Sequence, residues 1–72
     1  MSSRPFDLLN ESVGKPVLVV TKGNLSFRGT LKAFDVHMNV VLEDAEELVD
    51  GETKKKYGKL IIRGDTVILI SP

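Results

Sequence analysis

The chain has no cysteine, and His37 is its only histidine. Disulfides are therefore excluded, and one imidazole without a thiolate leaves only carboxylates to complete a zinc site, so we expect no metal. A chain of 72 residues has room for one domain, expected over residues 1–72, with a core near the lower limit of independent stability. Self-assembly is the remaining source of extra stability.

Targeting and membrane signals are also lacking. The first residues, Met1-Ser2-Ser3-Arg4, do not lead into an apolar core with a cleavage site, and no apolar run approaches the ~20 residues of a membrane span. We expect a soluble protein with no membrane partner. The absence of cysteine is compatible with the reducing cytoplasm, which is the expected compartment.

An excess of either charge is missing too, since ten basic and ten acidic residues cancel. A neutral chain is not attracted to every phosphate backbone, which weighs against a general binder of duplex DNA. Charge is nevertheless patterned, because an acidic stretch over residues 43–50 precedes Gly51 and a run of lysines, 54–56, follows it. We expect these runs to be solvated loop tips.

The opening segment predicts one helix over about residues 5–13. Pro5 suits a first helical position, and Gly14 supplies a left-handed exit. Apolar side chains would share one face of this helix, with Leu8 beside them: Phe6, Leu9 and Val13.

From Lys15 onward, β-branched and aromatic runs alternate with turn residues, which predicts an all-β body. The expected strands cover residues 16–21, 25–33, 40–43, 57–63 and 66–70, with a hairpin turn at 22–24. The predicted fold class is all-β with one N-terminal helix, in which a strongly bent, five-stranded antiparallel sheet forms a small open barrel. Gly29 lies within the second strand, so we interpret it as the point of curvature.

The last two predicted strands are apolar on both faces, because Ile61 alternates with Leu60 and Ile62 and the same pattern continues over 66–70. In a monomer these strands would be exposed edges prone to aggregation. A neighbouring subunit would cover these edges. Because the edge strand of one subunit would pair with the other edge strand of the next, the contact is heterologous, and it closes into a ring if the rotation per subunit permits.

Two polar clusters lie at breaks between strands, over residues 35–39 and 62–65. Recognition of single-stranded RNA needs a flat stacking face, donors and acceptors for a base edge, and a cation near the phosphates. His37, Asn39 and Arg63 supply one of each.

These two clusters resemble the two signature motifs of the Sm and Sm-like family. Residues 29–42 match the first motif, and residues 62–65, followed by an apolar strand, match the second. The resemblance implies the Sm fold, with subunits joined through the last two strands. It is closest to archaeal-type members, which implies a homoheptameric ring that binds single-stranded, uridine-rich RNA in ribonucleoprotein assembly, RNA processing or RNA chaperoning.

The resemblance also implies roles for individual residues. A uracil base would lie between His37 and Arg63, while Asn39 reads its edge and Asp35 orients Asn39. Asp65, with the backbone of Gly64, would complete the pocket. A second RNA site on the helix side of the ring is implied at two further positions: Arg4 and Phe34.

The sequence also bears on other classes of function. Asp35 and Asp65 form no plausible acid–base pair in a chain without a nucleophile, a metal set or a deep cleft, so we expect no enzyme and no cofactor. An oligomeric scaffold for proteins, without RNA specificity, stays open because fold alone does not exclude it. A monomeric oligonucleotide-binding barrel is a third reading, which 1:1 binding without a ring would reveal.

Overall fold

The computed structural model describes residues 4–72. One helix, α1, is followed by six strands and a short 3-10 turn, η1. Their bounds are α1 Pro5–Ser12, β1 Pro16–Thr21, β2 Leu25–Phe34, β3 Val40–Val49, β4 Glu52–Lys56, β5 Lys59–Ile62, η1 Gly64–Thr66 and β6 Val67–Ser71. Within residues 4–72, no helix has the length and apolar character needed to cross a membrane.

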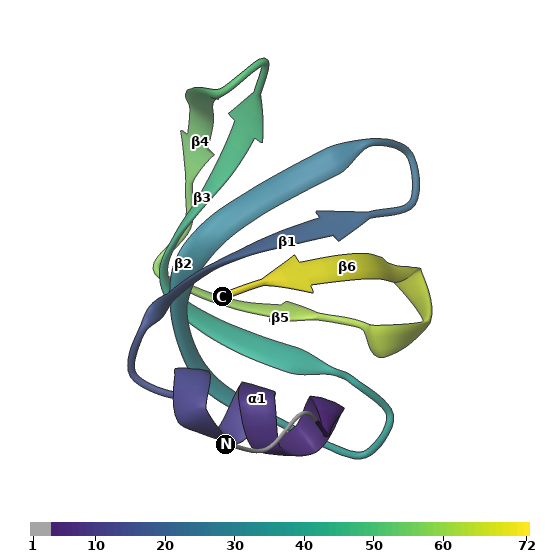
Figure 1. Cartoon of the computed structure of the whole chain (residues 1–72). Coiled ribbons are helices and arrows are strands. Elements are labelled where there is room, and N and C mark those ends of the chain that lie inside the picture. Colours follow the sequence, from purple (N-terminus) through teal and green to yellow (C-terminus); the bar gives the residue numbers. More distant parts are fainter. Residues whose placement is uncertain (1–3) are drawn as a thin grey trace.

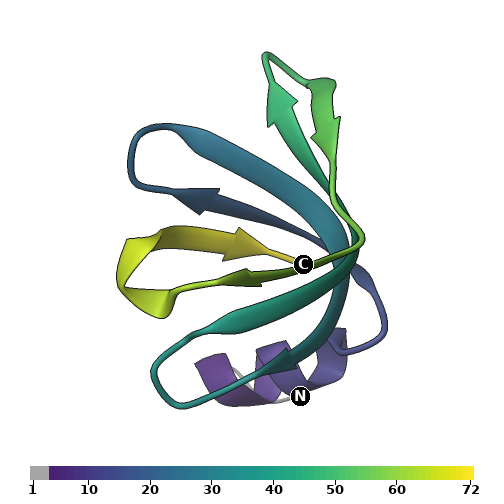
Figure 2. The same ribbon diagram turned by 180° about the vertical axis from the view of Figure 1, so that it is seen from behind.

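All six strands belong to one antiparallel sheet in the order β4-β3-β2-β1-β6, and β5 also pairs with β3. The sheet is strongly bent, with α1 at one end and the β3–β4 hairpin projecting at the other (Figures 1 and 2). The predicted fold class is therefore confirmed. The strand count differs because the predicted fourth strand, 57–63, contains only β5, whereas β4 pairs with β3 in a segment that was expected to be a loop.

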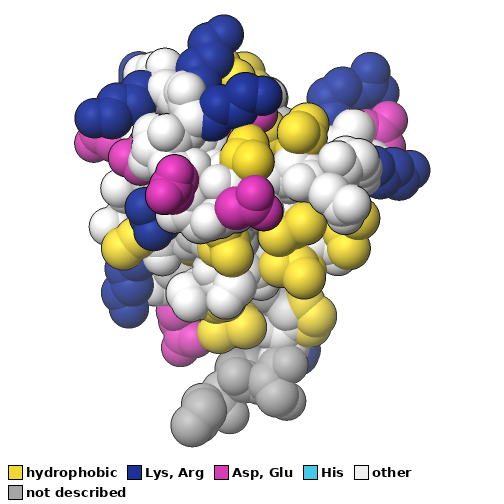
Figure 3. Space-filling model, turned by 90° about the horizontal axis from the view of Figure 1, so that it is seen from above, with side chains coloured by type: hydrophobic (Ala, Val, Ile, Leu, Met, Phe, Trp, Pro, Cys, Tyr) yellow, Lys and Arg dark blue, Asp and Glu magenta, His cyan; other side chains and the backbone are white. Residues whose placement is uncertain are grey.

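The charged hairpin corrects one expectation. The acidic stretch is not a loop, because β3 continues to Val49 and pairs with the lysine run of β4. Glu46 lies opposite Lys56 and Glu47 opposite Lys55, and opposite charges at such positions favour strand pairing. Seen from the hairpin end, acidic and basic side chains are interspersed with hydrophobic ones (Figure 3).

The bounds of the last strands also differ from the prediction. Tyr57 and Gly58 lie between β4 and β5, yet they stay attached to β3: Tyr57 N donates to Ala45 O at 2.7 Å, and Ala45 N donates to Gly58 O at 3.3 Å. Thr66 ends the η1 turn and does not begin the final strand. Regular strand pairing stops where hydrogen bonds form a bend. The alternation of residue types does not reveal where such a bend lies, so it does not give these strand bounds.

Gly29 is a point of curvature, as predicted. The pairing of β2 with β3 shifts register between Arg28 and Thr30, and Asp44 on β3 has a φ of 51°. A β-carbon at position 29 would lie 2.9 Å from Glu43 O and 3.1 Å from Ala45 Cα, both backbone atoms. Glycine is needed there because the two strands approach so closely.

The core fills the concave side of this bend. Its buried members come from α1 and from β1, β2, β3 and β5: Leu9, Val17, Val19, Phe27, Leu31, Val40, Leu42, Ala45 and Ile62. Of the predicted apolar helix face only Leu9 is buried, whereas Phe6 is 44% exposed and stacks on Phe34 with ring centroids 5.8 Å apart. Gly14 takes the predicted left-handed conformation, with a φ of 88°.

Strands β5 and β6 are the edges that the alternation predicted. Each pairs with the sheet on one side only, β5 with β3 and β6 with β1. Their outward side chains are strongly exposed, with Ile61 at 71% and Ile68 at 60%. Two apolar, unpaired edges on one small domain are the features that a neighbouring copy would cover.

The close approach at Gly29 predicts a specific cost. Gly29→Ala should destabilise the fold by about 1–3 kcal/mol, because the added methyl group meets backbone atoms that do not rotate away. Gly58→Ala is the control, since a β-carbon there meets nothing within 4 Å. Urea denaturation monitored by circular dichroism measures both variants, and equal stability of the two would contradict this account of the bend.

Candidate nucleic-acid interface

The β2–β3 loop, residues 35–39, is closed on itself. Asp35 N donates to Asn39 O at 3.2 Å, and Met38 N donates to Asp35 O at 3.0 Å. Met38 has a φ of 62°, and its side chain packs against the core. The chain thus reverses within a few residues, and His37 is left exposed at the tip.

The Asp35 carboxylate holds this loop in shape. Its Oδ1 accepts from the backbone N–H groups of His37 at 2.9 Å and Asn39 at 3.1 Å, and its Oδ2 accepts from Asn39 Nδ2 at 3.0 Å. The bond from the Asn39 side chain, helped by these backbone bonds and the nearby imidazole, holds the pKa of Asp35 below its usual value of 3.8 against an opposing effect of desolvation.

Asn39 connects this loop to the second polar cluster. Its Oδ1 accepts from Gly64 N at 2.7 Å, across 25 positions of sequence. Because the ionised Asp35 carboxylate only accepts hydrogen bonds, Nδ2 must face it and Oδ1 must face Gly64. The amide therefore has a fixed orientation, with one N–H and one oxygen lone pair left for a ligand.

Gly64 is required at this junction. A β-carbon there would overlap the carbonyl oxygen of His37 and lie 2.6 Å from the carbonyl carbon of Met38. The two loops are thus in direct backbone contact, and any side chain at position 64 would separate them.

Arg63 and Asp65 flank this glycine. Arg63 Nη2 donates to Asp65 Oδ2 at 2.9 Å, and both side chains are exposed. Thr66 fixes the turn below them, because its hydroxyl donates to Arg63 O at 2.7 Å and its N–H to the same oxygen at 3.1 Å. The sequence interpretation missed Thr66; a hydroxyl residue directly after a Gly-Asp break was the available signal.

One open pocket collects most of the predicted site. It is lined by His37, Met38, Asn39, Arg63, Gly64 and Asp65. Asp35 lies behind Asn39 and, with Asn39 and Arg63, lines a neighbouring hollow. All six predicted residues of the main site therefore come together, and no group of three or more potential metal ligands lies within residues 4–72.

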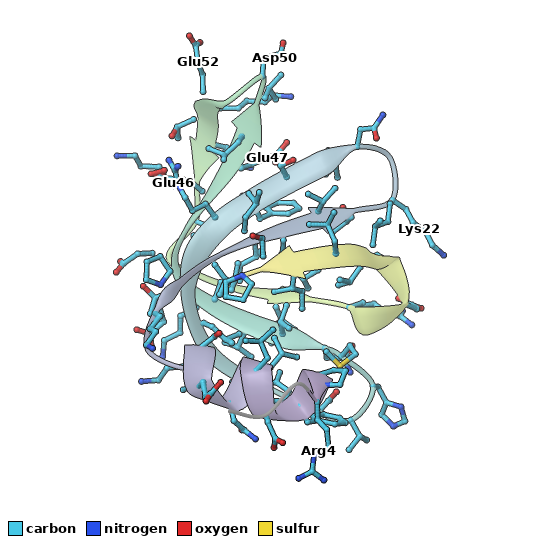
Figure 4. All side chains as sticks on the ribbon, viewed as in Figure 1. Arg4, Lys22, Glu46, Glu47, Asp50 and Glu52 are labelled. Atoms are coloured by element: carbon cyan, nitrogen blue, oxygen red, sulfur yellow. The ribbon has the colours of Figure 1, made fainter. Side chains whose placement is uncertain are left out.

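The two residues predicted for a second site lie elsewhere. Phe34 ends β2 and stacks on Phe6, while Arg4 Nε donates to Asp7 Oδ2 at 3.0 Å. Arg4 points outward at the helix end of the molecule (Figure 4). These contacts give both residues a structural role, and a role in binding RNA stays a prediction.

The fold is a small, helix-capped, bent β-sheet with a polar pocket where two strand connections meet. Comparison with known proteins agrees with this class: the model of the LSM domain family matches residues 7–72. An snRNP Sm-like protein of Archaeoglobus fulgidus is 54% identical over 72 residues, which are 100% of this chain and 94% of that protein. The chain therefore belongs to the LSM domain family.

Solved structures agree with the fold. The Sm protein of Pyrococcus abyssii, solved in complex with a uridine heptamer, has a TM-score of 0.94 and 53% identity, over 97% of this chain and 99% of that one. A heptameric archaeal Sm protein has a TM-score of 0.86 and 45% identity, over 92% of this chain and 96% of that one.

The lowered pKa of Asp35 predicts how the loop responds to acid. A carboxyl group with a depressed folded pKa stabilises the loop fully above its usual value of 3.8, and this contribution is lost as the pH falls through the lower folded pKa. In an NMR titration, the backbone amides of His37 and Asn39 should shift with a midpoint below 3.8. Asp35→Asn should abolish this transition, and a midpoint at or above that value would contradict the hydrogen-bonding scheme.

Proposed function

We propose that this protein forms a ring of identical subunits and binds single-stranded, uridine-rich RNA in the pocket around His37, Asn39 and Arg63. The observation that carries the proposal is the bond from Gly64 N to Asn39 Oδ1, which joins both polar clusters into one pocket and fixes the amide. The Sm protein of Pyrococcus abyssii, which is 53% identical, was solved with a uridine heptamer.

The fixed amide suits uracil. The base edge places an N–H donor at N3 beside a carbonyl acceptor at O4, and the free lone pair and free N–H of Asn39 complement this order. Cytosine presents the reverse order, an acceptor at N3 beside an amino group. Because Asp35 and Gly64 prevent rotation of the amide, cytosine is disfavoured.

Stacking adds the remaining affinity. The imidazole of His37 and the guanidinium of Arg63 line the same pocket, and both groups are flat enough to stack on a base. One such contact contributes about 1–3 kcal/mol. A single pocket is weak, but identical pockets on one ring raise the affinity for a continuous strand by about 10²–10⁴ through effective concentration.

In the proposed ring, neighbouring subunits are joined through β5 and β6. These are unpaired apolar edges of different sequence, so β5 of one copy pairs with β6 of the next. The related archaeal Sm protein is heptameric, and we propose seven subunits here. We further propose binding without catalysis or a bound cofactor, in the cytoplasm.

Base selectivity tests the pocket. The protein should bind oligo-uridine at least about tenfold more tightly than oligo-cytidine, and His37→Ala or Asn39→Ala should each weaken oligo-uridine binding about tenfold or more, because every pocket of the ring loses the contact. Fluorescence anisotropy measures the affinities. Val36→Ala is the control, since Val36 shares the loop but is 72% exposed and lines no part of the pocket.

A protein scaffold without RNA specificity would give a different result. It would show no uridine preference, and none of the three variants would differ from the native chain. An oligonucleotide-binding monomer would bind 1:1 and show no ring.

Charges on the free edges test the assembly. The double variant Ile61→Glu with Ile68→Glu should be monomeric in native mass spectrometry and lose tight binding to uridine oligomers, because buried, unpaired carboxylates oppose the contact. Val49→Glu is the control, since Val49 is 45% exposed but lies on the projecting hairpin. A monomeric native chain at micromolar concentration would refute the ring.

A further inference from the structure

The uracil pocket is poor in positive charge for a site that holds RNA. Asp35 and Asp65 carry two negative charges beside the single cation of Arg63, which already pairs with Asp65 at 2.9 Å. Each nucleotide brings a phosphate, and phosphates are held by basic side chains. The two polar clusters hold no Lys or Arg besides Arg63, so a basic side chain beside them is the candidate for holding the phosphate.

Lys22 is attached to the second polar cluster through Thr66. Its N–H donates to Thr66 O at 2.8 Å, and the Thr66 hydroxyl donates to Arg63 O at 2.7 Å. Lys22 begins the turn between β1 and β2, in which Gly23 has a φ of 83° and Asn24 a φ of 60°. These bonds connect the turn to the segment that carries Arg63.

An open groove runs between Lys22 and Arg63. Thr21 and Thr66 also lie along it, and its other lining residues are apolar: Leu25, Phe27, Leu60, Ile61 and Ile62. Arg63 lines both this groove and the uracil pocket, so the two hollows are adjacent. Lys22 projects from the turn on the side of the molecule that carries the β5–β6 connection (Figure 4).

The Lys22 ammonium is available for a ligand. Its side chain is exposed and forms no ion pair within residues 4–72. By contrast, Arg28 pairs with Glu46 at 3.7 Å and Lys32 with Glu43 at 3.6 Å. Lys22 thus combines a free charge with a backbone that is anchored beside the site.

We propose that Lys22 holds an RNA phosphate as the strand leaves the uracil pocket past Arg63. This inference rests on the proposed function, and it adds a residue that neither polar cluster contains. An ammonium on a flexible stem serves as a point charge for phosphate and needs no exact geometry. In a ring, the contact recurs once per subunit along the strand.

Salt dependence distinguishes a phosphate contact from a base contact. Each phosphate neutralised on a single strand contributes about 0.7 to the slope of log affinity against log salt. With a uridine heptamer and salt from about 50 to 300 mM, Lys22→Gln should lower this slope by at least about 1 and weaken binding most at low salt. The preference for uridine over cytidine should remain, because phosphate contacts carry no base information.

Two further variants complete the test. Lys22→Arg should restore the slope, because it keeps the charge. Lys54→Gln makes the same charge change on the exposed β4 strand and should behave as the native protein. Native mass spectrometry of each variant confirms that the ring is intact.

The outcomes separate this inference from the proposed function. A native slope for Lys22→Gln, or an equal loss in Lys54→Gln, would overturn the role of Lys22 while leaving uridine binding in place. A native protein without uridine preference would refute the proposed function itself. A loss of base preference in Lys22→Gln would also overturn the inference, since it would place Lys22 at the base.

Discussion

At Gly29 the backbones of β2 and β3 lie so close that a single methyl group would meet Glu43 O at 2.9 Å. This contact bends the long strands, and the bend lets β3 pair with β2 along one side and with both β4 and β5 along the other. The β2–β3 loop and the β5–β6 connection are thereby brought to the same end of the strands, where the site forms. The bend also leaves β5 and β6 as separate, unpaired edges, so assembly and binding depend on one packing constraint.

Within the site, geometry is set by hydrogen bonds to an exposed carboxylate and not by burial. Asp35 accepts from two backbone N–H groups and one amide, and that amide then reaches Gly64. Each hydrogen bond in this series fixes the group that makes the next one, so the Asn39 amide is oriented before any ligand arrives. Preorganisation of this kind lowers the cost of ordering the side chain on binding. It is also what would let a small surface loop discriminate between bases in the proposed binding mode.

Much of this arrangement was predictable from the sequence, because residue type has a direct physical meaning at particular positions. Gly29 indicated the bend, the two-sided apolar pattern around Ile61 indicated the free edges, and the polar residues at the strand breaks indicated the pocket. The acidic stretch does not show the alternation of a strand, because the irregular pairing around Asp44 spaces the buried residues at Leu42, Ala45 and Leu48. Lys22 was not identified either, because its proximity to Arg63 arises from a tertiary contact between segments far apart in the chain.

The charge balance of the site follows from these constraints. In the proposed binding mode Asp35 and Asp65 oppose the approach of phosphates, but the Asp35 carboxylate holds the amide that we propose reads the base. A strongly basic pocket would bind any strand, and its electrostatic affinity would exceed the small energy that separates uracil from cytosine. A near-neutral pocket makes each contact weak and selective, and repetition around a ring then multiplies the affinity without adding non-specific attraction. On this proposal, a cation outside the pocket, on the β1–β2 turn, would strengthen the hold on the strand and leave base recognition to Asn39.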